Sequence, residues 1–469
     1  MKLVANCLGV LLAALHLTGS ISNQSLRAQT LVSTPNSAES SSLAQKPTLL
    51  AQAAKPSGIE TSLDQGKIAE AVLLIEHRWV KKFETYFGRN FPKQPRTVEQ
   101  SAETLGKIAA QTGKKPALIY IVPHPQQLEL ILVMPEGKPI HKRIFAANQV
   151  ALLRQVKEFT TSVVHPTQRN TNRYLLPAQQ LYQWMIAPLE ADLQAQNIDT
   201  LVFCLGTGLR TMPLPALHDG QQFLVEKYSV ARIPAFNLIN TNYVHLEKSQ
   251  VLAMGASEFK EEASLPAVPL ELSTITTKLW QGESFLNQEF TLANLQSQRQ
   301  QQPFKIIHLA THAAFEPGVP DNSYIQFWDA KLTLDQMKQL HWNNPLVELL
   351  VLSACKTAIG DEQAELGFAG LAVQTNVKSA IASLWNVSDE GTLALMTEFY
   401  QDLKTAPIKA EALRQAQMAL LNGQVDLIDG QLRSSRGNIA LPPALAKIEN
   451  QNFSHPYYWA AFTVVGSPW

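Results

Sequence analysis

Hydrophobic residues recur at helical steps in the first part of the chain. From Ile59 onward, apolar residues appear every three or four positions, which predicts an amphipathic helix with Asp64 as a possible cap. Its apolar face carries Ile68, Val72, Ile75, Trp79, Phe83 and Phe87. Beyond Pro116, the apolar runs ALIYIVP and LELILVMPEG flank the polar stretch HPQQ, which predicts a β-hairpin. Further helices are expected at ALLRQVKEFTTSV and LPAQQLYQWMIAPLEADL, and strands at TLVFCLG, QFLVEKYSVARIP and QVLAMGAS.

From residue 300 onward, strand and helix patterns alternate regularly. Strands are expected at FKIIHLATH, VELLVLSAC and SAIASLWNV, and helices at LTLDQMKQL, LGFAGLAVQTN, GTLALMTEFYQDL and KAEALRQAQMALL. Such alternation predicts right-handed crossovers and a mostly parallel α/β sheet. Functional sites of these sheets form outside the carboxyl ends of the strands. His312 and Cys355 each stand at such an end, so we expect them at one edge of one sheet.

Composition and the N-terminal segment bear on location and partners. Lys+Arg and Asp+Glu both number 39, so the charge gives no indication of a nucleic-acid partner. Lys2 followed by LVANCLGVLLAALHLTG predicts a signal peptide over residues 1–28 and export to the periplasm or the extracellular space. An uncleaved membrane anchor is the alternative. Residues 29–58 are rich in Ser, Ala, Gln, Thr and Pro, which predicts a flexible linker.

Cysteine usage excludes a disulfide framework. Without the signal peptide the chain keeps Cys204 and Cys355, and a single bridge between them is conceivable in an oxidising compartment. Cys204 stands inside a fully apolar strand, where a small buried core residue is expected.

Cys355 follows the apolar strand that ends at Leu352. A thiol that attacks a carbonyl needs access and a nearby base, and a histidine at the end of a neighbouring strand would supply that base. His312 precedes Cys355 by one crossover unit, close to the roughly 50 residues that separate the two in caspases. This order favours a Cys/His dyad over the alternative of an inert buried thiol.

His308 and His312 are four residues apart. In a regular strand both would face one side of the sheet about 13 Å apart, too far for one metal ion. If the stretch were helical the spacing would suit zinc, but HLATH lacks the glutamate of H-E-x-x-H and a third ligand is not evident. We therefore expect a core histidine at 308, a general base at 312, and no metal or other cofactor.

Six ordered motifs resemble the CHAT family, caspase-like peptidases related to separases and caspases. The motifs are LRTMPLPALHDGQQFLVEKYSVARIPA, IIHLATHAAF, VLSACKTAIGD, ELGFAGLAVQTNVKSAIASLWNVSDEGTLALMTEFYQDL, EALRQAQMALL and HPYYWAAFTVVG. The resemblance covers residues 175–469 and implies a caspase-like, mostly parallel sheet sandwiched by helices. It implies a degenerate, non-catalytic lobe over 175–300 and a catalytic lobe over 301–469, after a helical and hairpin region at 59–174.

The resemblance also implies residue roles. His312 would be the general base, Cys355 the nucleophile, and the backbone N–H groups of Ala313 and Cys355 the oxyanion hole. The family usually has glycine where this chain has Ala313, and a positive φ there would cost about 1 kcal/mol or more.

Related peptidases often bind a basic side chain of the substrate in an acidic pocket. Asp361 is the preferred carboxylate for that task, with Asp389 and Glu390 as further candidates. In SDEGTLALM, Asp389 and Glu390 also fit the start of a helix. The closing segment that contains His455, Tyr457, Tyr458 and Trp459 is expected to serve packing and to close an edge of the sheet.

These observations favour an exported cysteine endopeptidase that acts on a protein or peptide substrate. The alternative is a catalytically inactive caspase-like scaffold that binds a partner protein. Ala313 and the lack of helical repeats upstream favour that alternative. The sequence assigns residues 59–115 no role beyond covering the sheet or contacting a partner, and a metal hydrolase ranks last.

Overall fold

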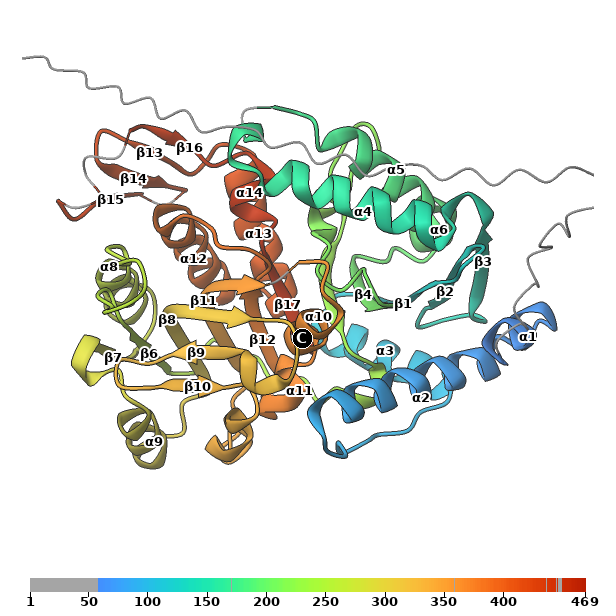
Figure 1. Cartoon of the computed structure of the whole chain (residues 1–469), viewed down its shortest axis with the longest axis horizontal. Helices are drawn as coiled ribbons and strands as arrows, with labels where there is room; N and C mark the ends of the chain where they lie inside the picture. Colours follow the sequence, from blue (N-terminus) through green and yellow to red (C-terminus); the bar gives the residue numbers. More distant parts are fainter. Residues whose placement is uncertain (1–57, 170, 358, 436, 444, 446–448) are drawn as a thin grey trace, which may run out of the picture. The chain divides into compact units, whose positions relative to one another are not determined.

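A large mixed sheet forms the centre of the molecule (Figure 1). The computed structural model describes residues 58–469 except 170, 358, 436, 444 and 446–448, and for residues 354 and 355 it describes the main chain. The predicted signal peptide lies outside the described residues. The predicted linker also lies outside them, except for its last residue, Gly58. Across the described part of the chain, no helix combines the length and the apolar character needed to cross a membrane.

The central sheet has 13 strands among the described residues, in the order β10-β9-β8-β11-β12-β17-β5-β4-β1-β2-β3, and β6 and β7 continue beside β8. The strands of this sheet are β1 (Pro116–Pro123), β2 (Leu128–Val133), β3 (Ile140–Ile144), β4 (Thr200–Leu205), β5 (Ser229–Ile233), β6 (Val251–Gly255), β7 (Gly282–Leu286), β8 (Ile306–Phe315), β9 (Tyr324–Gln326), β10 (Lys331–Thr333), β11 (Leu349–Thr357), β12 (Ser379–Ser383) and β17 (Phe462–Gly466). A small second sheet has the order β15-β14-β13-β16, formed by β13 (Asp426–Ile428), β14 (Gln431–Ser434), β15 (Gly437–Ala440) and β16 (Gln451–Asn452).

Most pairs in the central sheet are parallel. β7, β6, β8, β11 and β12 run in one direction, and β17, β5, β4 and β1 run in the other, because β17 is antiparallel to β12. The predicted hairpin is β1 and β2, which pair antiparallel. The predicted α/β class with a mostly parallel sheet is confirmed.

β17 lies in the middle of the sheet, between β12 and β5. The expectation that the closing segment covers an edge was therefore wrong. All five residues of β17 are buried, as its unbroken apolar run FTVVG requires of a strand with neighbours on both sides and helices on both faces. The chain thus places its last strand where it joins the two halves of the sheet.

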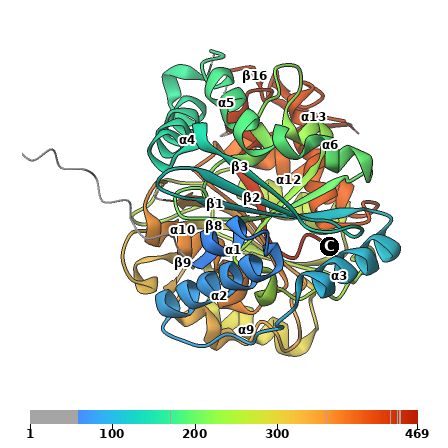
Figure 2. The ribbon, with the colours of Figure 1, turned by 90° about the vertical axis from the view of Figure 1, so that its right-hand side faces the viewer.

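The helices form two layers. They are α1 (Gly58–Asp64), α2 (Ile68–Phe87), α3 (Val98–Thr112), α4 (Gln149–Val164), α5 (Leu175–Met185), α6 (Ala187–Ala195), α7 (Leu224–Lys227), α8 (Val268–Ser273), α9 (Leu292–Gln301), α10 (Glu362–Ala369), α11 (Leu371–Thr375), α12 (Asp389–Leu403), α13 (Lys409–Leu421) and α14 (Pro456–Trp459). α2 and α3 lie below β1 and β2 in Figure 2, and α4, α5 and α6 lie above them. α10 packs against α2 in the first layer, and α13 and α12 pack against α14, which contacts α4, in the second.

Three predicted elements differ from the structure. The helix expected from Ile59 onward is two helices, and Lys67, not Asp64, stands at the N-cap of α2. The segment QFLVEKYSVARIP begins with α7 because the Glu226 carboxylate accepts a hydrogen bond from the Phe223 N–H, and only its second half is a strand. LTLDQMKQL forms β10 and a 3₁₀ turn in place of an α-helix.

The N-terminal helices cover the sheet, one of the two roles that the sequence left open. The Arg89 guanidinium donates to the carbonyl oxygens of Val373 and Gln374, both at 3.1 Å, at the end of α11. Glu76 is buried on α2 and accepts hydrogen bonds from the Tyr120 hydroxyl and from the backbone N–H groups of Phe236 and Asn237. These contacts tie the helical region to both halves of the sheet.

Candidate active site

The neighbouring strands β8 and β11 bring the main chains of the two predicted catalytic residues together. They pair in parallel, with His312 beside Ala354 and Ala313 beside Cys355. Neighbouring strands lie about 4.8 Å apart, and both residues stand toward the carboxyl ends of their strands. The edge of the sheet where an α/β protein places its site therefore carries both.

The pairing of β8 with β11 is irregular just before this point. Leu352 pairs with Leu309, but Ala354 pairs with His312, so β8 has one residue more than β11 within this step. An extra residue interrupts the regular alternation of side chains. The four-residue spacing of His308 and His312 therefore does not place both side chains on one side of the sheet, as a regular strand would.

His312 is held by the loop that follows β6. Its Nε2 lies 2.7 Å from the carbonyl oxygen of Ala263, and its ring contacts the Phe259 ring at a centroid distance of 4.6 Å. A carbonyl oxygen can only accept a hydrogen bond, so Nε2 carries the proton. In the neutral imidazole Nδ1 is then the free basic nitrogen, which is the state that a general base requires.

The same loop contacts Asp389. The Leu265 N–H donates to the Ser257 carbonyl at 2.9 Å and closes the loop, and the Ala267 N–H donates to the Asp389 carboxylate. Burial raises the pKa of Asp389 to about 7, and the nearby carboxylates of Glu271 and Glu390 add to the rise. A carboxyl group that titrates near neutral pH therefore contacts, from the start of α12, the loop that holds His312.

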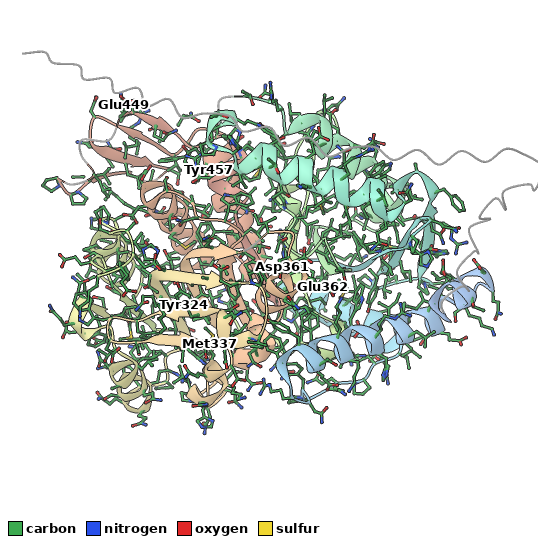
Figure 3. The ribbon with its side chains drawn as sticks, in the orientation of Figure 1. Tyr324, Met337, Asp361, Glu362, Glu449 and Tyr457 are labelled. Carbon is green, nitrogen blue, oxygen red and sulfur yellow. The ribbon has the colours of Figure 1, made fainter. Side chains whose placement is uncertain are left out.

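Asp361 has a different environment. It is the N-cap of α10, and its Oδ1 accepts hydrogen bonds from the N–H groups of Gln363 and Ala364, both at 2.9 Å. Figure 3 shows Asp361 and Glu362 near the middle of the molecule, with Tyr324 of β9 to their left. Conversely, Ser388 and not Asp389 is the N-cap of α12. Asp389 is thus the candidate carboxylate that contacts the same loop as His312, and Asp361 stabilises a helix terminus.

Ala313 lies within β8 and has an ordinary backbone conformation. Among the described residues, the non-glycine residues with positive φ are Asn197, Asn287, His341, Asn376 and Asp429. The strain considered for an alanine at position 313 is therefore absent. Ala313 pairs on one side with Cys355 and on the other with Ile325 of β9, so its backbone groups lie inside the sheet.

Two further residues lie in the core as predicted. His308 is fully buried, with Nδ1 3.2 Å from the Tyr400 hydroxyl and Nε2 3.1 Å from Glu271 Oε1. Cys204 is a free, fully buried thiol, and burial raises its pKa well above the ordinary value, so it stays protonated and unreactive. Within the described residues, no group of three or more His, Cys, Asp or Glu side chains is arranged to hold a metal ion.

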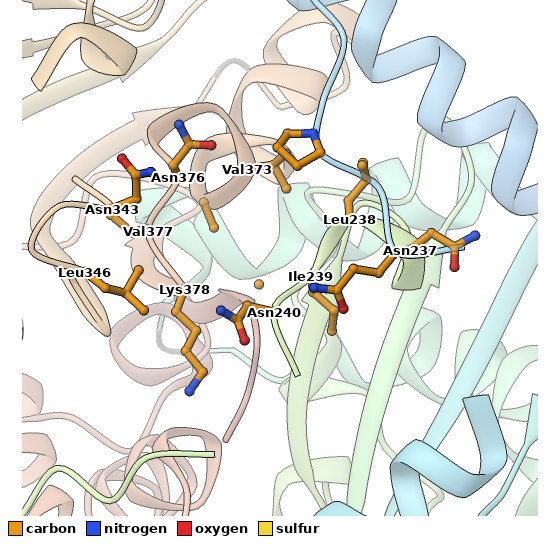
Figure 4. A pocket seen from close by; sticks show the side chains of 14 residues that line it. Asn237, Leu238, Ile239, Asn240, Asn343, Leu346, Val373, Asn376, Val377 and Lys378 are labelled. Atoms are coloured by element: carbon orange, nitrogen blue, oxygen red, sulfur yellow. The ribbon is translucent and has the colours of Figure 1, made fainter. Parts of the chain in front are cut away.

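Two cavities lie at different edges of the sheet, one near His312 and one opposite it. One of about 470 Å³ is lined by residues 258–262 and 326–331, and Phe259 belongs both to this lining and to the contact with His312. Another of about 230 Å³, shown in Figure 4, is lined by Asn237, Asn240, Asn376 and Lys378, among others. Lys378 directly precedes β12, so this second cavity lies at the amino end of a strand parallel to β8, at the edge opposite His312.

The role of the loop after β6 was not apparent from the sequence. Every residue has a backbone carbonyl, so the amino-acid type at position 263 does not indicate that its carbonyl binds His312. The signal would have been the pairing of β6 with β8, because parallel neighbours bring the loop after β6 to the same edge as His312. A single sequence does not reveal which strands pair.

The arrangement is that of an α/β protein with a mostly parallel sheet between helices and with a histidine and a cysteine toward the carboxyl ends of adjacent strands. The CHAT domain family matches residues 175–467, more than half of the chain, and the chain belongs to this family. No curated protein matches it in sequence.

Several solved structures are similar. A Saccharomyces cerevisiae separase–securin complex matches with a TM-score of 0.43 and 10% identity over 88% of this chain and 34% of that chain. A complex of the pro- and mature domains of Porphyromonas gingivalis RgpB has a TM-score of 0.38 and 11% identity, over 75% of this chain and 78% of that chain. The Arg-specific cysteine proteinase gingipain R has a TM-score of 0.36 and 9% identity, over 68% and 74%. The chain thus spans about a third of the length of the separase chain it matches.

Proposed function

We propose that this protein is a cysteine endopeptidase in which His312 and Cys355 form the catalytic dyad. The pairing of β8 with β11, which sets the main chain of Cys355 beside Ala313 and next to His312, carries the proposal. Membership of the CHAT family supports it. The substrate is a polypeptide, and the cavity of about 470 Å³ beside Phe259 is the candidate cleft for part of it.

In the proposed reaction, Nδ1 of His312 takes the proton of the Cys355 thiol while Nε2–H stays bound to the Ala263 carbonyl. The thiolate attacks the peptide carbonyl carbon, a C–S bond forms, and the carbonyl oxygen becomes an oxyanion. The imidazolium returns the proton to the leaving amine as the C–N bond breaks. Water then attacks the thioester, His312 takes its proton, and the thiol is released with the new carboxylic acid.

Asp389 is the proposed recognition residue for a basic side chain of the substrate. It lies at the start of α12 and accepts a hydrogen bond from the Ala267 N–H of the loop that holds His312, whereas Asp361 is bound to two backbone N–H groups at the start of α10. A carboxyl group with a pKa of about 7 becomes more fully charged as the pH rises above neutral, so cleavage after basic residues increases over that range.

A peptide probe with an electrophilic group after an arginine tests the proposal. Labelling of the full chain, in a Cys7→Ser background, is expected to disappear with Cys355→Ala and to fall by about 100-fold or more with His312→Ala. His245→Ala is the matched control, because His245 is partly exposed and lies in the segment before β6, whereas the loop that holds His312 follows β6. Equal labelling of all four proteins would remove the basis of the dyad.

One observation favours the inactive scaffold as a second candidate. Ala313 is paired with β11 on one side and β9 on the other, so its N–H points toward a neighbouring strand. An oxyanion donor must have a free N–H. The scaffold hypothesis predicts no cleavage in a broad peptide library, together with partner binding that survives Cys355→Ala.

We also propose that the chain is exported and that residues 1–28 are removed. The N-terminal charge and apolar run support this proposal. An exported thiol is exposed to oxidation, so mass spectrometry of the intact protein from its native source would identify both the N-terminal residue and the oxidation state of Cys355. Detection of the intact N-terminus in a membrane fraction would favour the uncleaved anchor.

A further inference from the structure

A cluster of four buried polar side chains lies beneath the candidate site. Glu271 comes from α8, His308 from β8, Ser353 from β11 and Tyr400 from α12, and each is at most 1% exposed. The Ser353 hydroxyl donates to Glu271 Oε1 at 2.6 Å. The same Oε1 lies 3.1 Å from His308 Nε2, and Nδ1 of His308 lies 3.2 Å from the Tyr400 hydroxyl.

A carboxylate at this depth is costly unless it is hydrogen-bonded or paired. The groups that face Glu271 are His308 from β8, Ser353 from β11, and Tyr400 and Asp389 from α12. Within the described residues, no lysine or arginine forms an ion pair with Glu271. Burial and Glu271 raise the pKa of Tyr400, so its hydroxyl stays protonated and can donate to His308 Nδ1. The cluster is therefore a buried polar network in which the Ser353 hydroxyl bonds Glu271, whereas His308 Nε2 lies beside Glu271 without forming a hydrogen bond. Apolar side chains would fold at lower cost at this position.

Ser353 connects this network to the irregular step in the pairing of β8 with β11. Ser353 stands between Leu352 and Ala354, the step at which β8 carries its extra residue. Thr311, on the opposite side of that step, donates through its hydroxyl to the Gln326 carbonyl at 2.6 Å. Both sides of the irregular step are thus fixed by side-chain hydrogen bonds, and His312 and Cys355 follow immediately after it. An irregular step in a strand pair re-aims the residues that come next.

We propose that Glu271 is a positioning residue that, by accepting the hydrogen bond of Ser353 on β11 beside His308 on β8, fixes the irregular step of β8 and β11 and thereby sets the main chain of His312 and Cys355. The effect of Glu271 on catalysis rests on the proposed function, whereas its effect on the two strands does not. The structural part concerns the two strands alone.

Amide hydrogen exchange of the full chain tests the structural part. Ser353→Ala and Glu271→Gln are expected to speed exchange of the amides at 310–315 and 352–357 by about tenfold or more, because the irregular step loses its anchor. Tyr400→Phe is the matched control: it removes one hydroxyl from the same cluster but leaves the bond between Glu271 and Ser353. Ser353→Thr keeps the hydroxyl and is expected to restore slow exchange. Equal exchange in Ser353→Ala, Glu271→Gln and Tyr400→Phe would overturn the proposal.

Alkylation of Cys355 by iodoacetamide, measured against pH in a Cys7→Ser background, tests the catalytic part. Cys204 is fully buried and adds no background. Ser353→Ala and Glu271→Gln are expected to slow alkylation near pH 6 about tenfold, toward the behaviour of an unactivated thiol, whereas Tyr400→Phe and Ser353→Thr stay within twofold of the unmodified chain.

The controls separate the two possible failures. If His312→Ala slows alkylation but Ser353→Ala and Glu271→Gln do not, the dyad stands and the positioning role of Glu271 is overturned. If His312→Ala leaves alkylation unchanged, the proposed function fails, and the exchange experiment alone decides whether Glu271 fixes the strands.

Discussion

Asp389 is a residue near the site whose ionisation depends strongly on its burial. Burial holds its pKa at about 7, far above the ordinary value of 3.8, so the folded chain binds this proton more tightly than the unfolded chain does. Between those two pH values the unfolded state holds fewer protons at this group, and stability falls as the pH rises. The loss is complete only above the folded pKa.

Asp389→Asn is therefore expected to become more stable than the unmodified chain as the pH increases from about 4 to about 8. An asparagine side chain keeps an oxygen that accepts from the Ala267 N–H but cannot become charged. Urea unfolding of both proteins at pH 4.5, 6 and 8 measures the difference. A difference in unfolding free energy that does not change with pH would show that Asp389 is ionised as easily as in water.

Ala313→Gly tests whether the residue after the histidine limits activity. Ala313 lies in a strand and has no positive φ, so a glycine at this position has no backbone strain to remove. The substitution is expected to cost about 0.5–1 kcal/mol of stability, because glycine is less favourable in a strand. We expect a slightly lower melting temperature and unchanged probe labelling of Cys355. A large gain in labelling would show that the alanine methyl group obstructs the site.

At the scale of elements, the patterns predicted what depends on local composition. Apolar runs correctly predicted β8, β11, β12 and β4, because strands that are buried on both faces are apolar along most of their length. The predictions of a strand in place of α7 and of an α-helix in place of the 3₁₀ turn after β10 were wrong. The hydrogen bond from the Phe223 N–H to the Glu226 carboxylate at the start of α7 leaves no trace in the hydrophobic pattern. The dyad could be proposed from strand ends, whereas the Ala263 carbonyl depends on which strands pair, a long-range property.

The close approach of β6 and β8 can be tested at Gly255. A Cβ on Gly255 would lie 2.4 Å from the Ala310 carbonyl oxygen and 2.9 Å from Val268 Cγ1, so the two strands and α8 would have to move apart. Gly255→Ala is expected to cost about 2–3 kcal/mol of unfolding free energy. It should also weaken probe labelling, because the loop that holds His312 starts at the end of β6.

Gly106→Ala is the matched control for Gly255→Ala. Gly106 lies inside α3, where the nearest atom to a new Cβ, Pro135 Cβ, is 3.9 Å away. Alanine is a better helix former than glycine, so this variant should gain about 0.5–1 kcal/mol. Chemical denaturation checks both variants, and equal effects would indicate that β6 and β8 can separate without cost.

At the scale of the whole molecule, buried polar contacts join the two halves of the sheet. Arg232 on β5 is 1% exposed and donates to the Thr463 hydroxyl on β17 at 3.1 Å, to the Met212 carbonyl at 2.8 Å and to the Arg210 carbonyl. Glu365 on α10, in the other half, accepts from the Gly208 N–H at 2.9 Å. The segment 208–212 is thus held by residues from both halves, and burial lowers the pKa of Arg232.

Arg232→Met is expected to lower the unfolding free energy by about 3 kcal/mol. Methionine fills a similar volume but leaves the Met212 and Arg210 carbonyl oxygens and the Thr463 hydroxyl without their donor in a site that water does not reach. Arg154→Met, on the exposed side of α4, should change stability by no more than about 0.5 kcal/mol. Urea denaturation of the two variants gives the comparison. If Arg232→Met were as stable as Arg154→Met, apolar packing around β17 alone would hold the halves together, and the buried arginine would have no part in joining them.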